Sequence, residues 1–140
     1  MKCTIILIGL LTQLAGYSQD TGPKVTVQNL EGKSGQIYIA WYNSATAFAS
    51  KQKAAFMKSI KVSGQNEVHV PFEAIPPGKY AVAVYLDENG NGIIDKNFLG
   101  IPKERYGFSN NPSPAMRAPR YEEAVFEVVS GKEGVVIKLK

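Results

Sequence analysis

One short segment carries oxygen-bearing side chains at the spacing of a cation-binding loop. Residues 87–95 read Asp-Glu-Asn-Gly-Asn-Gly-Ile-Ile-Asp. The oxygen donors fall at loop positions one, three, five, seven and nine: Asp87, Asn89, Asn91, the backbone carbonyl of Ile93, and Asp95. A glycine at position six matches the sharp turn around which calcium gathers its oxygen ligands. We therefore expect these five residues to bind calcium.

The segment differs from an EF-hand in ways that limit its affinity. The twelfth position is Phe98 rather than a bidentate glutamate, and Pro102 limits any helix that would follow. We expect Glu88 to point away and Glu104 to fold back toward the loop. Few charges imply weak binding, on the order of 10⁻⁴–10⁻³ M. The alternative is a metal-free turn, since Asp, Asn and Gly also suit tight turns without any ion.

A second group of polar and aromatic residues follows within residues 99–111. Its candidate ligand-binding residues are Glu104, Tyr106, Phe108, Asn110 and Asn111. Such a mixture is typical of a recognition loop on a rigid scaffold, so we expect a small polar ligand, a glycan or a protein as partner. The alternative is that the two aromatic side chains pack as a lid on the end of the fold.

Residues for catalysis are sparse. His69 is the only histidine, and it lies in an alternating segment where we expect it to face solvent. The chain has no Gly-x-Ser-x-Gly, zinc-binding histidine pattern or phosphate-binding glycine loop. We therefore predict a non-catalytic protein. A metal-dependent hydrolase would require Asp95, Glu104 and His69 to converge in one cleft.

The elements that position these residues are predicted to be short strands. Alternating or β-branched runs predict strands over residues 25–30, 37–42, 67–72, 80–86, 123–129 and 135–139. Residues 44–59 favour one or two short helical turns, with Ser44 or Ser50 as the cap and with Phe48, Phe56 and Met57 filling the core. We predict an all-β fold: an antiparallel β-sandwich of immunoglobulin or transthyretin type, with about seven strands and one helical insertion.

The N-terminal residues have the features of an export signal. Lys2 precedes an apolar stretch over residues 5–14, too short for the ~20 residues of a spanning helix. We expect residues 1–18 to be a signal peptide and residues 19–140 to form one domain, periplasmic or extracellular, without a membrane span. Cys3, the only cysteine, lies inside the signal, so the exported chain would have no thiol.

The charge of the exported chain argues against nucleic acid as a partner. Removal of Lys2 leaves 15 of the 16 Lys and Arg residues against 12 Asp and Glu. These basic residues are scattered, and the densest group, within residues 51–61, has no interleaved aromatic platform for bases. We interpret that group as a solvated face.

Three segments together resemble a known family. Gly-Lys-Tyr-Ala-Val at 78–82, the loop at 87–95 and the run Leu-Gly-Ile-Pro-Lys-Glu-Arg-Tyr-Gly-Phe-Ser-Asn-Asn at 99–111 are similar to the bacterial secreted family called domain of unknown function 2141. The resemblance spans about residues 25–140, with Lys103 and Ala118 as departures. It implies a small exported bacterial β-sandwich and no established activity. The Asp/Asn/Gly loop is also similar to calcium loops of β-sandwich repeats in bacterial surface adhesins.

Overall fold

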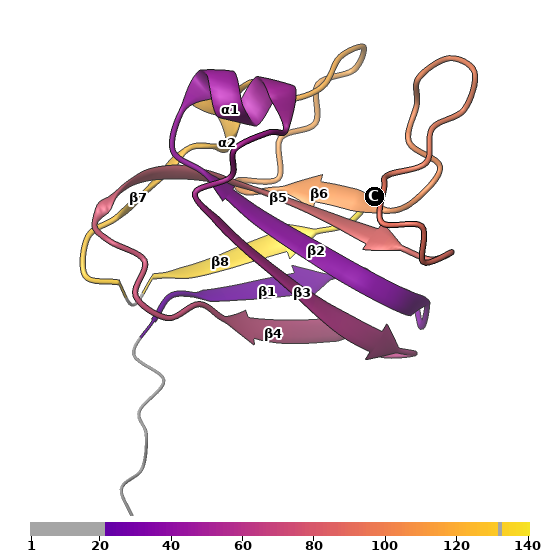
Figure 1. Ribbon diagram of the computed structural model, residues 1–140, viewed down its shortest axis with the longest axis horizontal. Helices are drawn as coiled ribbons and strands as arrows, with labels where there is room; N and C mark the ends of the chain where they lie inside the picture. Colours follow the sequence, from indigo (N-terminus) through magenta and orange to yellow (C-terminus); the bar gives the residue numbers. More distant parts are fainter. Residues whose placement is uncertain (1–21, 132) are drawn as a thin grey trace, which may run out of the picture.

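The strands lie in two stacked layers in the computed structural model, which describes residues 22–131 and 133–140 (Figure 1). One sheet has the order β4-β1-β8, formed by β4 (Glu67–Pro71), β1 (Lys24–Gln28) and β8 (Gly134–Lys138). The other has the order β3-β2-β5-β6, formed by β3 (Phe56–Ser63), β2 (Ser34–Tyr42), β5 (Gly78–Asp87) and β6 (Tyr106–Phe108), and β7 (Phe126–Val128) also pairs with β5. All pairs are antiparallel except β1 with β8. The predicted all-β sandwich is confirmed, with eight strands.

The core between the sheets follows from the alternation along the strands. In β5, Val82, Val84 and Leu86 point inward and are buried. Trp41 of β2 is fully enclosed, with the ring centroids of Phe72 and Tyr80 at 5.4 and 5.7 Å from its own. Because no cysteine lies among the described residues, the two sheets are held together by this apolar contact and by hydrogen bonds.

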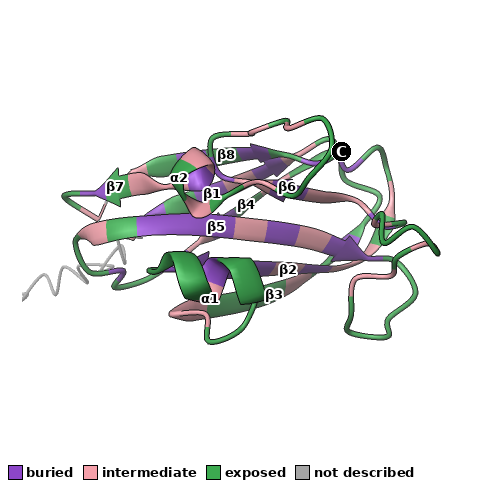
Figure 2. Cartoon of the chain, turned by 90° about the horizontal axis from the view of Figure 1, so that it is seen from above, coloured by how far each residue is buried: buried purple, intermediate pink, exposed green. Residues whose placement is uncertain are grey.

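Two short helices cover the outer face of the larger sheet (Figure 2). These are α1 (Ala45–Ser50) and α2 (Tyr121–Ala124). Phe48 of α1 is buried against Ala40 and Ala81, whose small side chains leave room for its ring. The hydroxyl of Ser44 accepts a hydrogen bond from the Ala47 N–H at 3.2 Å, so Ser44 is the cap, one of the two predicted.

The prediction of helical turns up to residue 59 was wrong in its second half. Residues 56–63 form β3, an edge strand paired with β2. Phe56 packs against the core, but Met57 is 68% exposed and fills nothing. The sequence did not reveal this strand because Lys58 lies on the same inward-facing side as Phe56 and Ile60. A charged residue at that position interrupts the apolar alternation. At an edge, Lys58 reaches the Pro71 carbonyl and the Phe72 ring instead.

The predicted strand over residues 123–129 begins later than expected. Residues 121–124 form α2, and only 126–128 form a strand. Glu123 explains the helix, because its carboxylate accepts the Arg120 N–H at 2.8 Å and a bidentate pair of bonds from the Arg117 guanidinium. The long aperiodic stretch at 96–120 also contains β6, a strand too short to give a periodic signal.

Candidate functional site

Strand β5 ends at Asp87, which organises the loop at residues 87–95. Asp87 is 1% exposed. Its carboxylate accepts hydrogen bonds from the N–H groups of Gly90 at 2.8 Å and Gly92 at 2.7 Å. Both glycines have positive φ, +76° and +77°, a conformation that other residues adopt at a cost. The glycine turn expected from the sequence is therefore present, and it wraps around the Asp87 carboxylate at loop position one.

The remaining loop side chains meet at Asp95. The Asn91 amide donates to both oxygens of the Asp95 carboxylate at 3.0 Å, and the Asn89 amide donates to the same group. Oδ1 of Asn89 accepts the Asn91 N–H, and Oδ1 of Asn91 accepts the Ile93 N–H, each at 3.1 Å. The side chains of loop positions three and five thus both hydrogen-bond to the carboxylate of position nine.

Glu104 folds back onto the loop, as the sequence suggested. It is 7% exposed, and its carboxylate accepts the N–H groups of Glu88 at 3.0 Å and Asp95 at 3.1 Å. One buried side chain therefore joins the two ends of the loop. The Glu88 side chain points away as expected and forms an ion pair with Lys33 at 2.9 Å.

Tyr85 supports the loop from the outer face of the sheet. Its hydroxyl donates to the Gly92 carbonyl at 2.9 Å, and its ring stacks on Tyr38 with centroids 5.0 Å apart. Burial, then the neighbouring Tyr38 and the carboxylates of Asp87 and Glu104, raise the pKa of Tyr85 to about 12. The hydroxyl therefore keeps its proton and remains a donor to the loop even in alkaline solution, where an ordinary tyrosine would begin to ionise.

His69 is not part of this loop. It lies on β4, where its Nδ1 is 2.9 Å from the Thr26 hydroxyl and its Nε2 is 3.1 Å from the Glu67 carboxylate. Its side chain is 57% exposed, as predicted. Glu104 bonds to the backbone N–H of Asp95, and His69 bonds to neither residue. Across the described residues, no three His, Cys, Asp or Glu side chains are grouped to hold a metal.

The predicted aromatic recognition residues are half-buried in β6. The Phe108 ring packs against Phe48 of α1 at 5.7 Å and against Tyr106 at 5.9 Å. Both rings keep part of their surface in solvent. The packing expected in the alternative is therefore present, and a ligand contact through the exposed part of the two rings remains a prediction.

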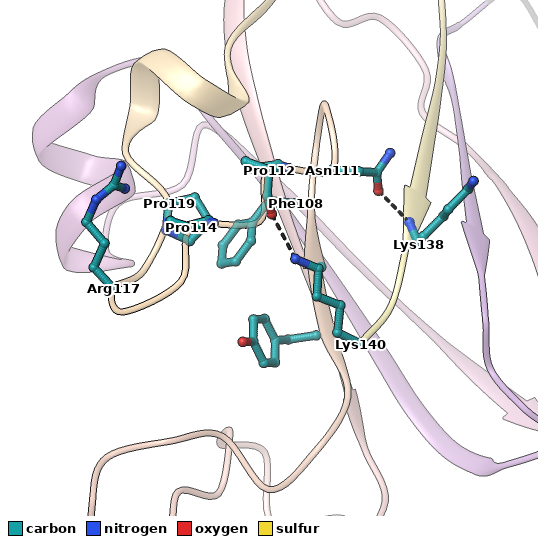
Figure 3. A pocket seen from close by; sticks show the side chains of 10 residues that line it. Phe108, Asn111, Pro112, Pro114, Arg117, Pro119, Lys138 and Lys140 are labelled. Atoms are coloured by element: carbon teal, nitrogen blue, oxygen red, sulfur yellow. Dashed lines mark hydrogen bonds between the residues drawn. The ribbon is translucent and has the colours of Figure 1, made fainter.

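Asn110 and Asn111 use their amide groups within the fold. The Asn111 side chain accepts the Lys138 N–H at 2.7 Å and donates to the Val136 carbonyl at 2.9 Å, as a neighbouring strand would (Figure 3). Asn110 donates to the Val125 carbonyl at 2.8 Å. Asn111 thereby covers part of the edge of β8.

A shallow hollow lies beside β6. Three of the predicted ligand-binding residues, Tyr106, Phe108 and Asn111, line it. The other lining residues include six that the sequence did not predict: Pro112, Pro114, Pro119, Arg117, Lys138 and Lys140. The Lys140 ammonium donates to the Pro112 carbonyl at 2.9 Å (Figure 3). The volume is about 30 Å³, room for one or two waters. The spacing of the three prolines could have indicated this part of the surface from the sequence. The position of Lys140 beside them depends on the tertiary fold.

Comparison with known proteins places the chain in a family. Residues 25–136 match the model of the family described as "Uncharacterized protein conserved in bacteria (DUF2141)". Neither the curated proteins nor the solved structures compared with the chain gave a match. The family match spans most of the chain, including the loop at 87–95, β6 and the lining residues of the hollow up to Pro119. The chain therefore belongs to the DUF2141 family of uncharacterized bacterial proteins.

Proposed function

We propose that this protein is an exported, non-catalytic binding module whose loop at residues 87–95 takes up a calcium ion. One observation carries the calcium proposal: the side chains of Asn89 and Asn91 converge on the Asp95 carboxylate, in a loop whose backbone is held by the buried Asp87. The donors are carboxylate, amide and backbone oxygens, which suit a hard cation such as calcium rather than zinc.

The ion would be held by the five donors named by the sequence, with Asp95 as the most accessible charge. Asn89 and Asn91 would present Oδ1 to the ion, and Ile93 its backbone carbonyl. Glu104 would position the loop rather than bind the ion, because its carboxylate holds the N–H groups of Glu88 and Asp95. With so few carboxylates, we expect a dissociation constant on the order of 10⁻⁴–10⁻³ M, the range of extracellular modules.

A second candidate is a structural domain whose loop needs no ion. The observation that favours it is that both oxygens of Asp87, and both of Glu104, already accept backbone N–H groups. In this alternative, hydrogen bonds from the amides of Asn89 and Asn91 stabilise the charged Asp95 carboxylate, so that no cation is needed there.

The binding role is supported by the hollow beside β6. Its half-buried Tyr106 and Phe108 offer aromatic surface, and Lys138 adds positive charge at the rim. A space for one or two waters does not enclose a small molecule. The ligand that fits best is a glycan or polypeptide lying across the surface, where sugar rings or side chains contact the two aromatic residues.

Export and the absence of catalysis are the remaining parts of the proposal. Export rests on residues 1–18, which lie outside the described residues. Non-catalytic function rests on the separation of His69 from Asp95 and Glu104 and on the lack of a nucleophile motif. Within the described residues, no helix has the length and apolar character needed to cross a membrane.

Calorimetric titration with calcium tests the central part of the proposal. The chain from Gln19 onward contains every described helix and strand, and it should bind calcium saturably, with a melting temperature that rises with calcium concentration. Asp95→Asn removes one charge while keeping the shape and should abolish the heat. Glu88→Gln is the matched control, because that side chain faces Lys33, and it should bind as the parent does.

Two results would oppose the calcium proposal. Absence of heat and of a melting shift at millimolar calcium would assign the loop to the metal-free alternative. Equal binding by the Asp95→Asn variant would place the ion elsewhere in the chain.

A further inference from the structure

The loop that follows Asp95 forms a narrow finger with an apolar tip. Residues 95–103, here called the finger, stand clear of the sheets at the upper right of Figure 1. Phe98 is 95% exposed, Leu99 68% and Ile101 54%. Three large apolar side chains are thus exposed within four residues, and such clustering of exposed apolar side chains indicates an interaction surface.

Hydrogen bonds hold the finger in shape, while the side chains at its tip are left exposed by the part of the chain that the structure describes. The Lys103 N–H donates to the Asp95 carbonyl at 2.7 Å, and the Asn97 N–H donates to the Ile101 carbonyl at 2.8 Å. Oδ1 of Asn97 then accepts the N–H groups of Leu99 and Ile101 at 2.9 and 3.0 Å. The local bonds therefore keep Phe98 and Leu99 in water in the free protein, a conformation prepared for contact.

The charges around the tip decide what the finger would contact. Lys96 and Lys103, both exposed, stand on the two strands of the finger, and no acidic side chain lies between them. The Asp95 carboxylate at the base is engaged by the two asparagine amides. The complementary surface is thus apolar with a negative rim. An anionic lipid bilayer has this arrangement, with acyl chains for the tip and headgroups for the lysines.

We propose that the finger inserts Phe98 and Leu99 into the interface of an anionic membrane, with Lys96 and Lys103 contacting the headgroups. The contact is peripheral, because the tip is only a few residues long. It holds this end of the sandwich, with the loop at 87–95, against the bilayer. The proposal does not depend on calcium binding, since the ion has no part in the tip or in its lysines.

A tryptophan at the tip gives a direct test. Trp41, the only tryptophan, is fully buried and cannot report on lipid. In the chain from Gln19 carrying Phe98→Trp, vesicles of phosphatidylcholine and phosphatidylglycerol should shift the emission to the blue, and brominated acyl chains should quench it. The parent chain, with Trp41 alone, should show neither change. The measurement is made in a calcium chelator, so its outcome is separate from that of the calcium titration.

Paired variants locate the contact. Phe98→Ser with Leu99→Ser should lower vesicle co-sedimentation by about tenfold or more. Met116→Ser with Val129→Ser, which removes two other exposed apolar side chains, should leave it unchanged. Lys96→Gln and Lys103→Gln should each lower binding roughly fivefold, and binding should fall as salt rises.

Three outcomes would overturn the proposal. The first is no blue shift with anionic vesicles. The second is equal co-sedimentation of the tip variant and the Met116/Val129 control. The third is self-association of the parent chain, seen by ultracentrifugation and lost in the tip variant, which would assign the finger to a second protein copy instead.

Discussion

Asp87 is the residue on which the conformation of the loop depends most. Its two oxygens accept the N–H groups of Gly90 and Gly92, and the side chain is almost fully buried. Asp87→Asn replaces one acceptor with an amide group that faces an N–H, so we expect a loss of about 1–3 kcal/mol of unfolding free energy. Urea unfolding measures it.

The control for this prediction lies one residue along the chain. Glu88→Gln removes the same charge, but its side chain forms only a surface ion pair with Lys33. We expect a change within about 0.5 kcal/mol. Equal stability of the Asp87→Asn variant and the parent chain would show that the buried carboxylate does not organise the loop.

Glu123 predicts how stability responds to acid. Hydrogen bonds from the Arg117 guanidinium and from the Arg120 N–H lower its pKa from 4.5 to about 2. The unfolded chain therefore takes up the proton first, so this stabilisation is present above pH 4.5 and is lost as the pH falls toward 2. Melting temperature against pH should decline over this window, and less steeply in Glu123→Gln. An unchanged slope in that variant, or an equal effect of Glu122→Gln, would contradict the prediction.

At the residue scale, the sequence predicted the loop better than it predicted the residues around it. The Asp/Asn/Gly spacing is local, so the roles of Asp87, Gly92 and Glu88 could be anticipated from turn chemistry. The amides of Asn110 and Asn111 bond to backbone groups of segments that lie beyond residue 120. Such partners are fixed only by the tertiary fold, and no local pattern encodes them.

At the scale of elements, β6 joins the two sheets. Backbone bonds link Tyr106 and Lys140 in both directions, which brings β6 beside the end of β8. Gly107 permits this approach, because a Cβ there would lie 2.7 Å from Ile137 Cγ2 and 2.9 Å from the Lys138 carbonyl oxygen. The glycine in this short strand is therefore required by close packing.

A substitution in β6 tests that close approach. Gly107→Ala should lower the free energy of unfolding by about 1–3 kcal/mol, because β8 must move to admit the methyl group. Gly134→Ala, at a glycine whose Cβ would have no neighbour within 4 Å, should be neutral or slightly stabilising. Urea unfolding of both variants makes the comparison, and equal stabilities would indicate that the sheets do not pack as closely here as described.

Elements with strong alternation could be predicted, and elements shaped by their neighbours could not. β5 is apolar on its inward face and carries alanines outward, so its existence was evident. β3 was missed because Lys58 occupies an inward-facing position. A charged side chain is tolerated there because β3 lies at the edge of its sheet. The α2 helix was missed because four residues give no helical period, and its start depends on the contact between Arg117 and Glu123.

At the scale of the whole molecule, stability rests on the apolar layer between the sheets. Ile137 of β8 is fully buried in this layer, and its neighbour Val136 is 46% exposed on the opposite face. Ile137→Ala should cost about 2–5 kcal/mol, whereas Val136→Ala should cost less than about 1 kcal/mol. Thermal or urea unfolding measures both, and similar costs would mean that β8 does not present Ile137 to the core.

The arrangement of the molecule also explains how its candidate functions are distributed. The loop at 87–95 and the finger follow the end of β5 directly (Figure 1), while the hollow is lined by β6, by the segment that follows it and by Lys138 and Lys140 at the end of the chain. One sandwich thus presents the proposed calcium loop, an apolar tip and a partly aromatic hollow on separate segments. Rigid scaffolds with function on their loops are common among β-sandwich domains.

Terbium luminescence is the most direct test of the proposed calcium loop. Terbium binds oxygen donors as calcium does, and Tyr85, whose hydroxyl is 2.9 Å from the Gly92 carbonyl oxygen, would transfer excitation to an ion in the loop. We predict tyrosine-sensitised emission that saturates, is displaced by excess calcium, disappears in Asp95→Asn and persists in Glu88→Gln. No sensitised emission, or emission of equal strength from the Asp95→Asn variant, would contradict the proposal of a calcium site at residues 87–95.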